Sequence, residues 1–116
     1  MATAQLGALA QESRLAIYRL LVQQGEAGLA AGDIAARLLL PAPTLSFHLA
    51  QLKGAGLVRC RRESRSLIYT ADYGAMNALL GFLTDNCCGG QPELCAPQTA
   101  CAPAPAAAIA RKKRRA

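Results

Sequence analysis

The stretch PTLSFHLAQLKGAGLV, residues 43–58, decides how this chain folds. Leu45, Leu49 and Leu52 recur at the spacing of one helix face, which predicts an α-helix over residues 43–54. A proline suits the first turn of this helix, and the glycines of GAG suit its end. The helix is therefore short, and its leucine face must be buried against other parts of the chain.

Three more helices are predicted before this stretch, over residues 3–10, 12–24 and 31–39. Each carries apolar side chains about three or four residues apart, as an amphipathic helix does. Gly25 and Gly28 separate the second of these helices from the third. The apolar positions that define them are Leu6, Leu9, Leu15, Tyr18, Leu21, Val22, Ile34 and Leu38.

The chain changes character after residue 56. Residues 57–62 (LVRCRR) alternate between apolar and arginine side chains, and residues 66–70 (SLIYT) are rich in strand formers. The polar residues between them suit a tight turn, so we expect a β-hairpin. Asp72 is a suitable N-cap for a final helix that runs to about Asn86. The apolar stripe of that helix consists of Met76, Leu79, Leu80 and Leu83.

Four helices, a hairpin and a last helix predict a mainly α fold with a small β-hairpin, the winged helix-turn-helix. In that motif the second helix of the central pair, here residues 43–54, enters the major groove of DNA. We expect the DNA-binding and dimerisation domain to span residues 1–88. Residues 89–116 are rich in Cys, Ala and Pro without apolar periodicity, which predicts a flexible tail with a basic end.

Basic side chains gather in two places. The net charge is +6; residues 111–116 hold five basic residues, and residues 53–65 hold five of the other eight. A basic patch beside a candidate recognition helix indicates nucleic-acid binding, with hairpin arginines on phosphates and small polar side chains on base edges. His48 could instead hydrogen-bond within the helix pair, and Phe47 could pack beneath the β-hairpin, which is the wing of this motif. The residues expected at the DNA are Pro43, Thr44, Ser46, Phe47, His48, Gln51, Arg61, Arg62 and Arg65, with Arg59 beside them.

The stretch LSFHLAQLKGAGLV, residues 45–58, resembles the recognition helix and first wing strand of the ArsR/SmtB family of metal-responsive repressors. Residues 62–65 and 67–69 are similar to the wing of that family, and the resemblance covers residues 5–86. It implies a homodimer built from the first and last helices. It also implies binding to an imperfect inverted repeat in promoter DNA.

Length and composition limit the other possibilities. A chain of 116 residues has room for one compact domain. It contains no apolar run of about eighteen residues for a membrane span, and its N-terminus lacks the pattern of a signal peptide. We therefore expect a cytoplasmic protein. Catalysis is not expected, because the sequence offers no phosphate-cradling loop and no acid–base partner beside its cysteines.

Four of the five cysteines lie within residues 87–101. In a compartment that keeps thiols reduced, an odd number of cysteines argues against a disulfide framework. Trivalent arsenic and antimony are soft ions that prefer sulfur ligands, three in number. Cys87 and Cys88 diverge by about 100° on a regular helix, but both sulfurs can turn toward one ion at a frayed helix end. Cys95 would be the third ligand, and Cys101 is the costlier alternative because its loop is longer.

The segment Asn86-Cys87-Cys88, followed by Cys95, resembles the arsenic-responsive branch of the family, in which a cysteine pair ends the last helix. The resemblance implies As(III) or Sb(III) as inducer. Other branches place cysteines near the start of the recognition helix, where this chain has Leu38-Leu39-Leu40. The zinc-sensing branch uses histidines on the last helix, and this chain has none there. A zinc site made only of the C-terminal cysteines stays open.

Thiol-based redox sensing is a second hypothesis, because Cys87 or Cys88 could form a reversible disulfide with Cys95. Cys60 shares a strand face with Val58, so we expect it to be an inert small hydrophobe. The sequence does not separate arsenite, antimonite and methylarsenite as inducers. It also leaves open whether one subunit or both would supply the ligands.

Overall fold

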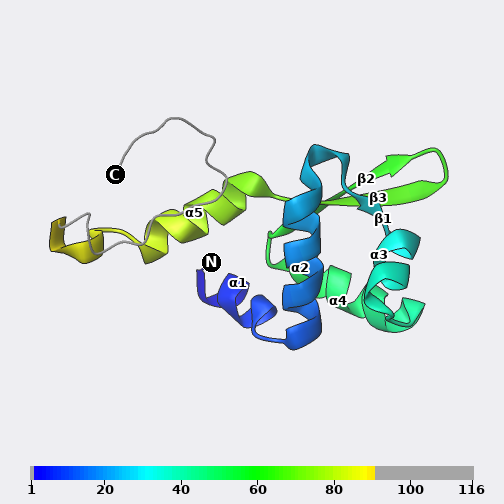
Figure 1. Ribbon diagram of the computed structural model, residues 1–116, viewed down its shortest axis with the longest axis horizontal. Coiled ribbons are helices and arrows are strands. Elements are labelled where there is room, and N and C mark those ends of the chain that lie inside the picture. The colour runs from blue at the N-terminus through cyan, green and yellow to red at the C-terminus, as the bar shows by residue number, and fades with distance from the viewer. Residues whose placement is uncertain (1, 91–116) are drawn as a thin grey trace. The chain divides into compact units, whose positions relative to one another are not determined.

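The computed structural model describes residues 2–90, and Figure 1 shows how their helices and strands are arranged. The chain divides into two units, the first ending at Leu83 and the second beginning at Thr84, and each is described by itself. Among the described residues, every helix falls short of the length and hydropathy that a membrane span requires. The elements are α1 (Ala2–Leu9), α2 (Glu12–Gln24), the 3-10 helix η1 (Gly25–Ala27), β1 (Leu29–Ala30), α3 (Ala31–Leu38), α4 (Ala42–Gly54), β2 (Val58–Glu63), β3 (Ser66–Ala71), α5 (Tyr73–Leu83) and the 3-10 helix η2 (Cys87–Gly90).

The strands β1, β3 and β2 form an antiparallel sheet in this order. Tyr69, in the central strand, pairs with Leu29 of β1 and with Cys60 of β2. The sequence predicts the β2–β3 hairpin, but it does not predict the two-residue strand β1. Gly28, just before β1, has a φ of +66°, and a Cβ atom there would collide with the carbonyl oxygen of Tyr69. Only glycine therefore allows these strands to meet.

The core of the first unit joins α2, α3 and α4 to the sheet. The prediction for α4 is confirmed, since its three stripe leucines are 0–2% exposed. In α2 the buried stripe runs through Ile17, Tyr18 and Leu21, whereas Leu15, which the sequence places on it, is 44% exposed. Ile17 and Leu21 are one helical turn apart and so share one face. The largest fully buried side chains are Ile17, Leu21, Ile34, Leu45, Leu49, Leu52 and Leu57.

The last long helix begins as predicted and ends early. The side-chain oxygen Oδ1 of Asp72 accepts a hydrogen bond from the backbone N–H of Ala75 at 3.0 Å, which confirms the predicted N-cap. The expected end at Asn86 is wrong, because α5 stops at Leu83. Thr, Asp and Asn follow, all weak helix formers, and Asn86 has a left-handed φ of 58°.

Candidate nucleic-acid interface and cysteine segment

A tight turn joins α3 to α4 and sets the angle of the helix pair. Leu39 occupies the left-handed region with a φ of 56°, and the N–H of Leu40 donates to the carbonyl of Ala35 at 3.1 Å. The N–H of Leu45 then donates to the carbonyl of Pro41 at 2.9 Å, which starts α4. Leu39 is 88% exposed, so this turn is fixed by backbone hydrogen bonds and not by burial of its side chain.

The helix α4 has one buried face and one face open to solvent. The exposed fraction of Phe47 is 58%, which is unusual for a large aromatic side chain in a core helix. The expected outward direction of this face is therefore confirmed, with a polar helix surface around one aromatic ring. Its exposed members are Pro43, Thr44, Ser46, Phe47 and Gln51.

His48 lies on the inner side of α4 and is only 7% exposed. Its ring nitrogen Nδ1 is 3.4 Å from Nη1 of Arg14, and Nε of Arg14 donates to the carbonyl of Ala8 at 2.7 Å. Arg14 thus connects α1, α2 and α4. This placement favours the hydrogen bond within the helices over the contact with DNA that the sequence also suggests.

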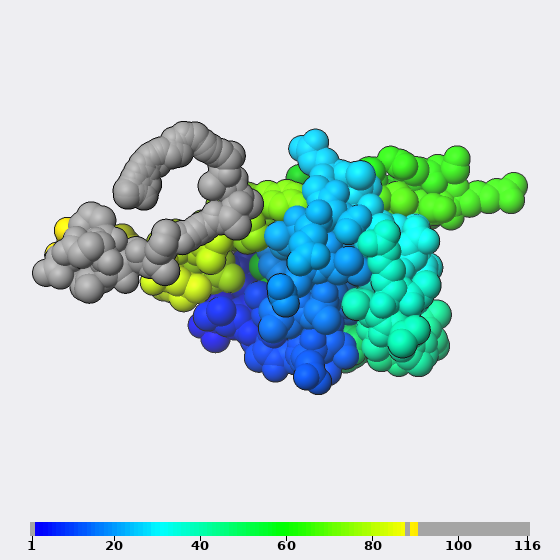
Figure 2. Space-filling model, viewed as in Figure 1, coloured from blue at the N-terminus to red at the C-terminus, as the bar shows by residue number. Residues whose placement is uncertain are grey.

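The wing presents its arginines in two different states. Arg61 is exposed, but its guanidinium is already bound: its Nε contacts Glu63 at 2.8 Å, and its Nη atoms donate to the carbonyls of Glu26 and Ala27 at 3.0 and 3.1 Å. Arg62 and Arg65 are exposed. Figure 2 shows the hairpin, in green, projecting beyond the helical body. Of the three wing arginines expected at the DNA, Arg61 therefore has a structural role that the sequence did not indicate.

Two tyrosines near the sheet are held in their neutral form. Burial raises the pKa of Tyr18, and the nearby Asp72 carboxylate and Tyr73 raise it further. Burial also raises the pKa of Tyr69, with a further contribution from the adjacent Cys60 thiol. Cys60 is half-buried beside Tyr69. Both phenols are therefore protonated at neutral pH, and both can donate a hydrogen bond.

The cysteine segment is only partly within the described residues. Cys87 is exposed and begins η2, and its backbone N–H donates to the carbonyl of Thr84 at 2.8 Å. Cys88 follows in the same 3-10 helix. Residues 2–90 bring together no group of three His, Cys, Asp or Glu side chains that could hold a metal ion. The predicted ligand Cys95 and its alternative Cys101 lie outside the described residues.

Apolar side chains are exposed on α1, α2 and α5. Phe82 is 66% exposed, and Leu80 and Leu83 are about half exposed. A cavity of about 580 Å³ opens beside Phe82 and is lined by residues of α1 and α5, among them Gln5 and Leu79. Leu6 and Leu15 add exposed leucines on α1 and α2. The first unit thus leaves an apolar surface that its own core does not cover, which indicates a contact with another protein surface.

Comparisons with known proteins agree with this geometry. A helix-turn-helix domain family matches residues 9–61. The transcriptional activator HlyU of Vibrio cholerae is 36% identical over 78 residues, which is 67% of this chain and 69% of that protein. A structure described as reduced HlyU aligns at 37% identity with a TM-score of 0.57, covering 72% of this chain and 88% of that chain. The fold and these matches define a winged helix-turn-helix DNA-binding transcriptional regulator.

Solved structures narrow the class further. An ArsR-like regulator from Rhodococcus sp. RHA1 aligns with a TM-score of 0.64 at 27% identity, over 71% of this chain and 74% of that chain. The homodimeric domain of Mb0332 from Mycobacterium bovis, a possible ArsR-family regulator, aligns with a TM-score of 0.56 at 35% identity. This alignment covers 73% of this chain and 80% of that chain. A possible transcriptional regulator for arsenical resistance aligns with a TM-score of 0.60 at 29% identity, over 68% of this chain and 79% of that chain. The chain belongs to the ArsR-like family of winged helix-turn-helix transcriptional regulators, and its relatives are regulators rather than enzymes.

Proposed function

We propose that this protein is a homodimeric cytoplasmic repressor that leaves its promoter when As(III) or Sb(III) binds the thiolates of Cys87, Cys88 and Cys95. The family membership supports the regulatory part of this proposal. The sulfur-rich sequence around Cys87 supports the soft-ion part. A structural relative described as a possible transcriptional regulator for arsenical resistance supports the choice of metalloid.

The two-faced helix α4 is the observation that carries the DNA-binding mode. Its leucine face is fixed in the core, and its polar face offers Thr44, Ser46 and Gln51 for hydrogen bonds to base edges in the major groove. Phe47 offers an apolar contact for a thymine methyl group. Arg62 supplies charge for phosphates, as does Arg65. The buried His48 and the exposed but already bound Arg61 contact neighbouring elements of the chain and hold these elements in place.

The apolar surface of α1 and α5 supports the proposed homodimer. A second copy of the chain would cover Phe82 and the cavity beside it, which a monomer leaves in water. The structurally similar Mb0332 domain is described as homodimeric. A dimer would place two α4 helices on the two halves of an inverted repeat.

The thiols follow α5 closely in the chain, and this supports a coupling between inducer and operator. Cys87 is four residues beyond Leu83, the last residue of α5. Three thiolates that share one ion would restrain the chain after this helix. If the restrained dimer binds DNA less well, each ligand lowers the affinity for the other by the same factor.

The experiment is a fluorescence anisotropy titration of promoter DNA with the reduced protein, followed by arsenite. The Cys87→Ser/Cys88→Ser variant is expected to keep its operator affinity and to lose release by arsenite. Cys60→Ser is the matched control and is expected to release as the natural protein does. Arsenite release that survives in the double variant would contradict the assignment of the thiols.

Redox sensing is the second candidate, and the resemblance to HlyU, which is known in a form described as reduced, favours it. A disulfide between Cys95 and either Cys87 or Cys88 would restrain the same segment without an ion. Peroxide that releases DNA reversibly with a thiol reductant, where arsenite does not, would favour this candidate. The same titration should include zinc, which tests a zinc site made of the C-terminal cysteines. It should also include the Cys101→Ser variant, which tests Cys101 as the third ligand in place of Cys95.

A further inference from the structure

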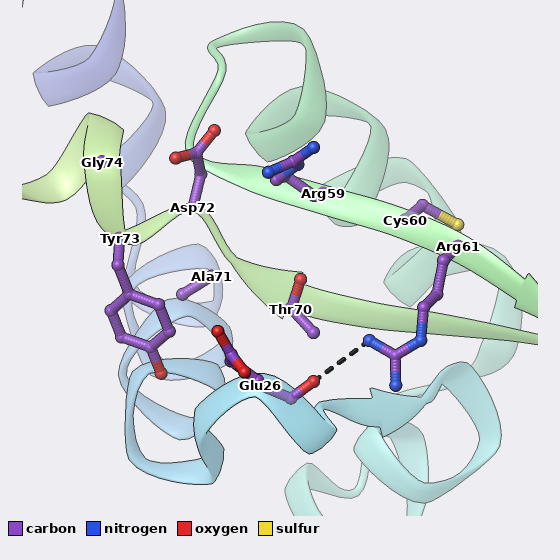
Figure 3. A pocket seen from close by; sticks show the side chains of 9 residues that line it. All are labelled: Glu26, Arg59, Cys60, Arg61, Thr70, Ala71, Asp72, Tyr73 and Gly74. Carbon is purple, nitrogen blue, oxygen red and sulfur yellow. Dashed lines mark hydrogen bonds between the residues drawn. The ribbon is translucent and has the colours of Figure 1, made fainter.

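A cleft of about 520 Å³ opens at the base of the wing. Its lining side chains come from η1, from the strands β2 and β3, and from the first turn of α5 (Figure 3). Arg59 and Thr70 are paired across the two strands, so both lie on the same sheet face. Glu26 lines the cleft from η1, and Asp72 lines it from the start of α5.

Three charges in this cleft lack a counter-ion. Among residues 2–90, the guanidinium of Arg59 makes no ion pair, and neither do the carboxylates of Glu26 and Asp72. Asp72 uses one oxygen to cap α5, which leaves its second oxygen for another donor. The cleft therefore presents one cation and two carboxylates that can still be paired.

Arg61 lines the same cleft but is already engaged. Its guanidinium contacts Glu63 at 2.8 Å and the carbonyls of Glu26 and Ala27 at 3.0 and 3.1 Å. These bonds fasten η1 to the wing, as Figure 3 shows for Glu26. The shape of the cleft is thereby fixed before any ligand enters, which lowers the cost of ordering on binding.

We propose that this cleft binds a small zwitterion of the α-amino acid class. The carboxylate would pair with the guanidinium of Arg59 and accept from the hydroxyl of Thr70, and the ammonium would pair with the second carboxylate oxygen of Asp72. A simple anion would face two carboxylates, and a simple amine would leave Arg59 without a partner. A ligand with both charges can pair with both kinds of charged side chain that line the cleft.

None of the residues that line the cleft belongs to α4 or to the cysteine segment that begins at Cys87. A ligand in the cleft would bridge η1, the wing and the start of α5, because the charged side chains of the cleft come from these three elements. The inference therefore adds a second, thiol-independent input to the regulator. It does not require that the metalloid proposal is correct.

The test uses the full chain and the twenty common amino acids at millimolar concentration. We expect at least one to raise the melting temperature and to give a measurable heat of binding by calorimetry. The affinity of that amino acid should fall at least about tenfold in Arg59→Gln. Arg19→Gln, an exposed arginine on α2 outside the cleft, is the matched control and should bind as the natural protein does.

Two further measurements test the two charges of the ligand separately. Asp72→Asn keeps an N-capping side chain and removes the charge, so it should weaken the amino acid while leaving the fold intact. Analogues of the bound amino acid without the amine or without the carboxylate should each bind at least about tenfold more weakly. Absence of binding by all twenty amino acids, or equal binding by Arg59→Gln, would overturn the proposal.

Discussion

The helices α4 and α5 are both rich in leucine, yet they bury it differently. In α4 the stripe leucines are 0–2% exposed. In α5 only Leu79 is buried, and Leu80, Phe82 and Leu83 are 51–66% exposed. The position of α4 is therefore fixed by contacts within one chain, whereas α5 leaves an apolar surface open for the proposed dimer partner. The same residue type can thus stabilise either the fold or the assembly.

The largest expected effect is the loss of stability when a buried leucine of α4 is shortened. Leu52→Ala should lower the free energy of unfolding by about 2–5 kcal/mol, because Leu52 is fully buried and the cavity cannot refill. Urea denaturation at several protein concentrations measures it. The matched control is Leu83→Ala in α5, which in the monomer should change stability by only about 0.5 kcal/mol. Equal losses in the two variants would remove the distinction between the helices.

A smaller effect is expected on the assembly. Phe82→Asp places a charge on the exposed surface of α5, so the dimer dissociation constant should rise at least about tenfold while the fold is kept. Analytical ultracentrifugation measures the constant, and circular dichroism checks the fold. Operator affinity should fall in parallel, because one half-site binds more weakly than two. An unchanged dissociation constant would show that α5 is not in the interface.

The smallest effect concerns the wing and sharpens the contrast between its arginines. Arg62→Gln should weaken operator binding by about 1 kcal/mol and reduce the salt slope by about one charge, because one phosphate contact is lost. Anisotropy titrations at several salt concentrations measure both values. Arg19→Gln, on the exposed side of α2, should leave both values unchanged. A salt slope that does not change in Arg62→Gln would exclude this phosphate contact.

Regular periodicity explains what could be predicted from the sequence. The leucines of α4 identify the helix because they report one buried face, and the alternation in β2 identifies the strand although Val58 is its one buried residue. The strand β1 has only two residues and therefore no pattern to read. A signal existed in Gly28, since a glycine before a short apolar pair is typical of close backbone contact.

Long-range contacts explain what could not be predicted about the site. The inward rotation of His48 depends on Arg14, which is 34 residues away in the chain. Arg61 likewise finds its carbonyl partners 34 and 35 residues away, in η1. Its position on the helix placed His48 at the DNA, and its charge placed Arg61 there. Only the folded chain shows that neighbouring elements already use them.

The fastening of Arg61 to η1 has a mechanical consequence. Because the hairpin is held near its middle, the segment from Arg62 to Ser66 behaves as a short lever with a fixed pivot. In a complex with DNA, bending of this segment would adapt Arg62 and Arg65 to the local width of a groove. Larger displacements of the tip would need rotation of the whole first unit, so in the proposed dimer the distance between the two hairpin tips would depend on the orientation of the two subunits.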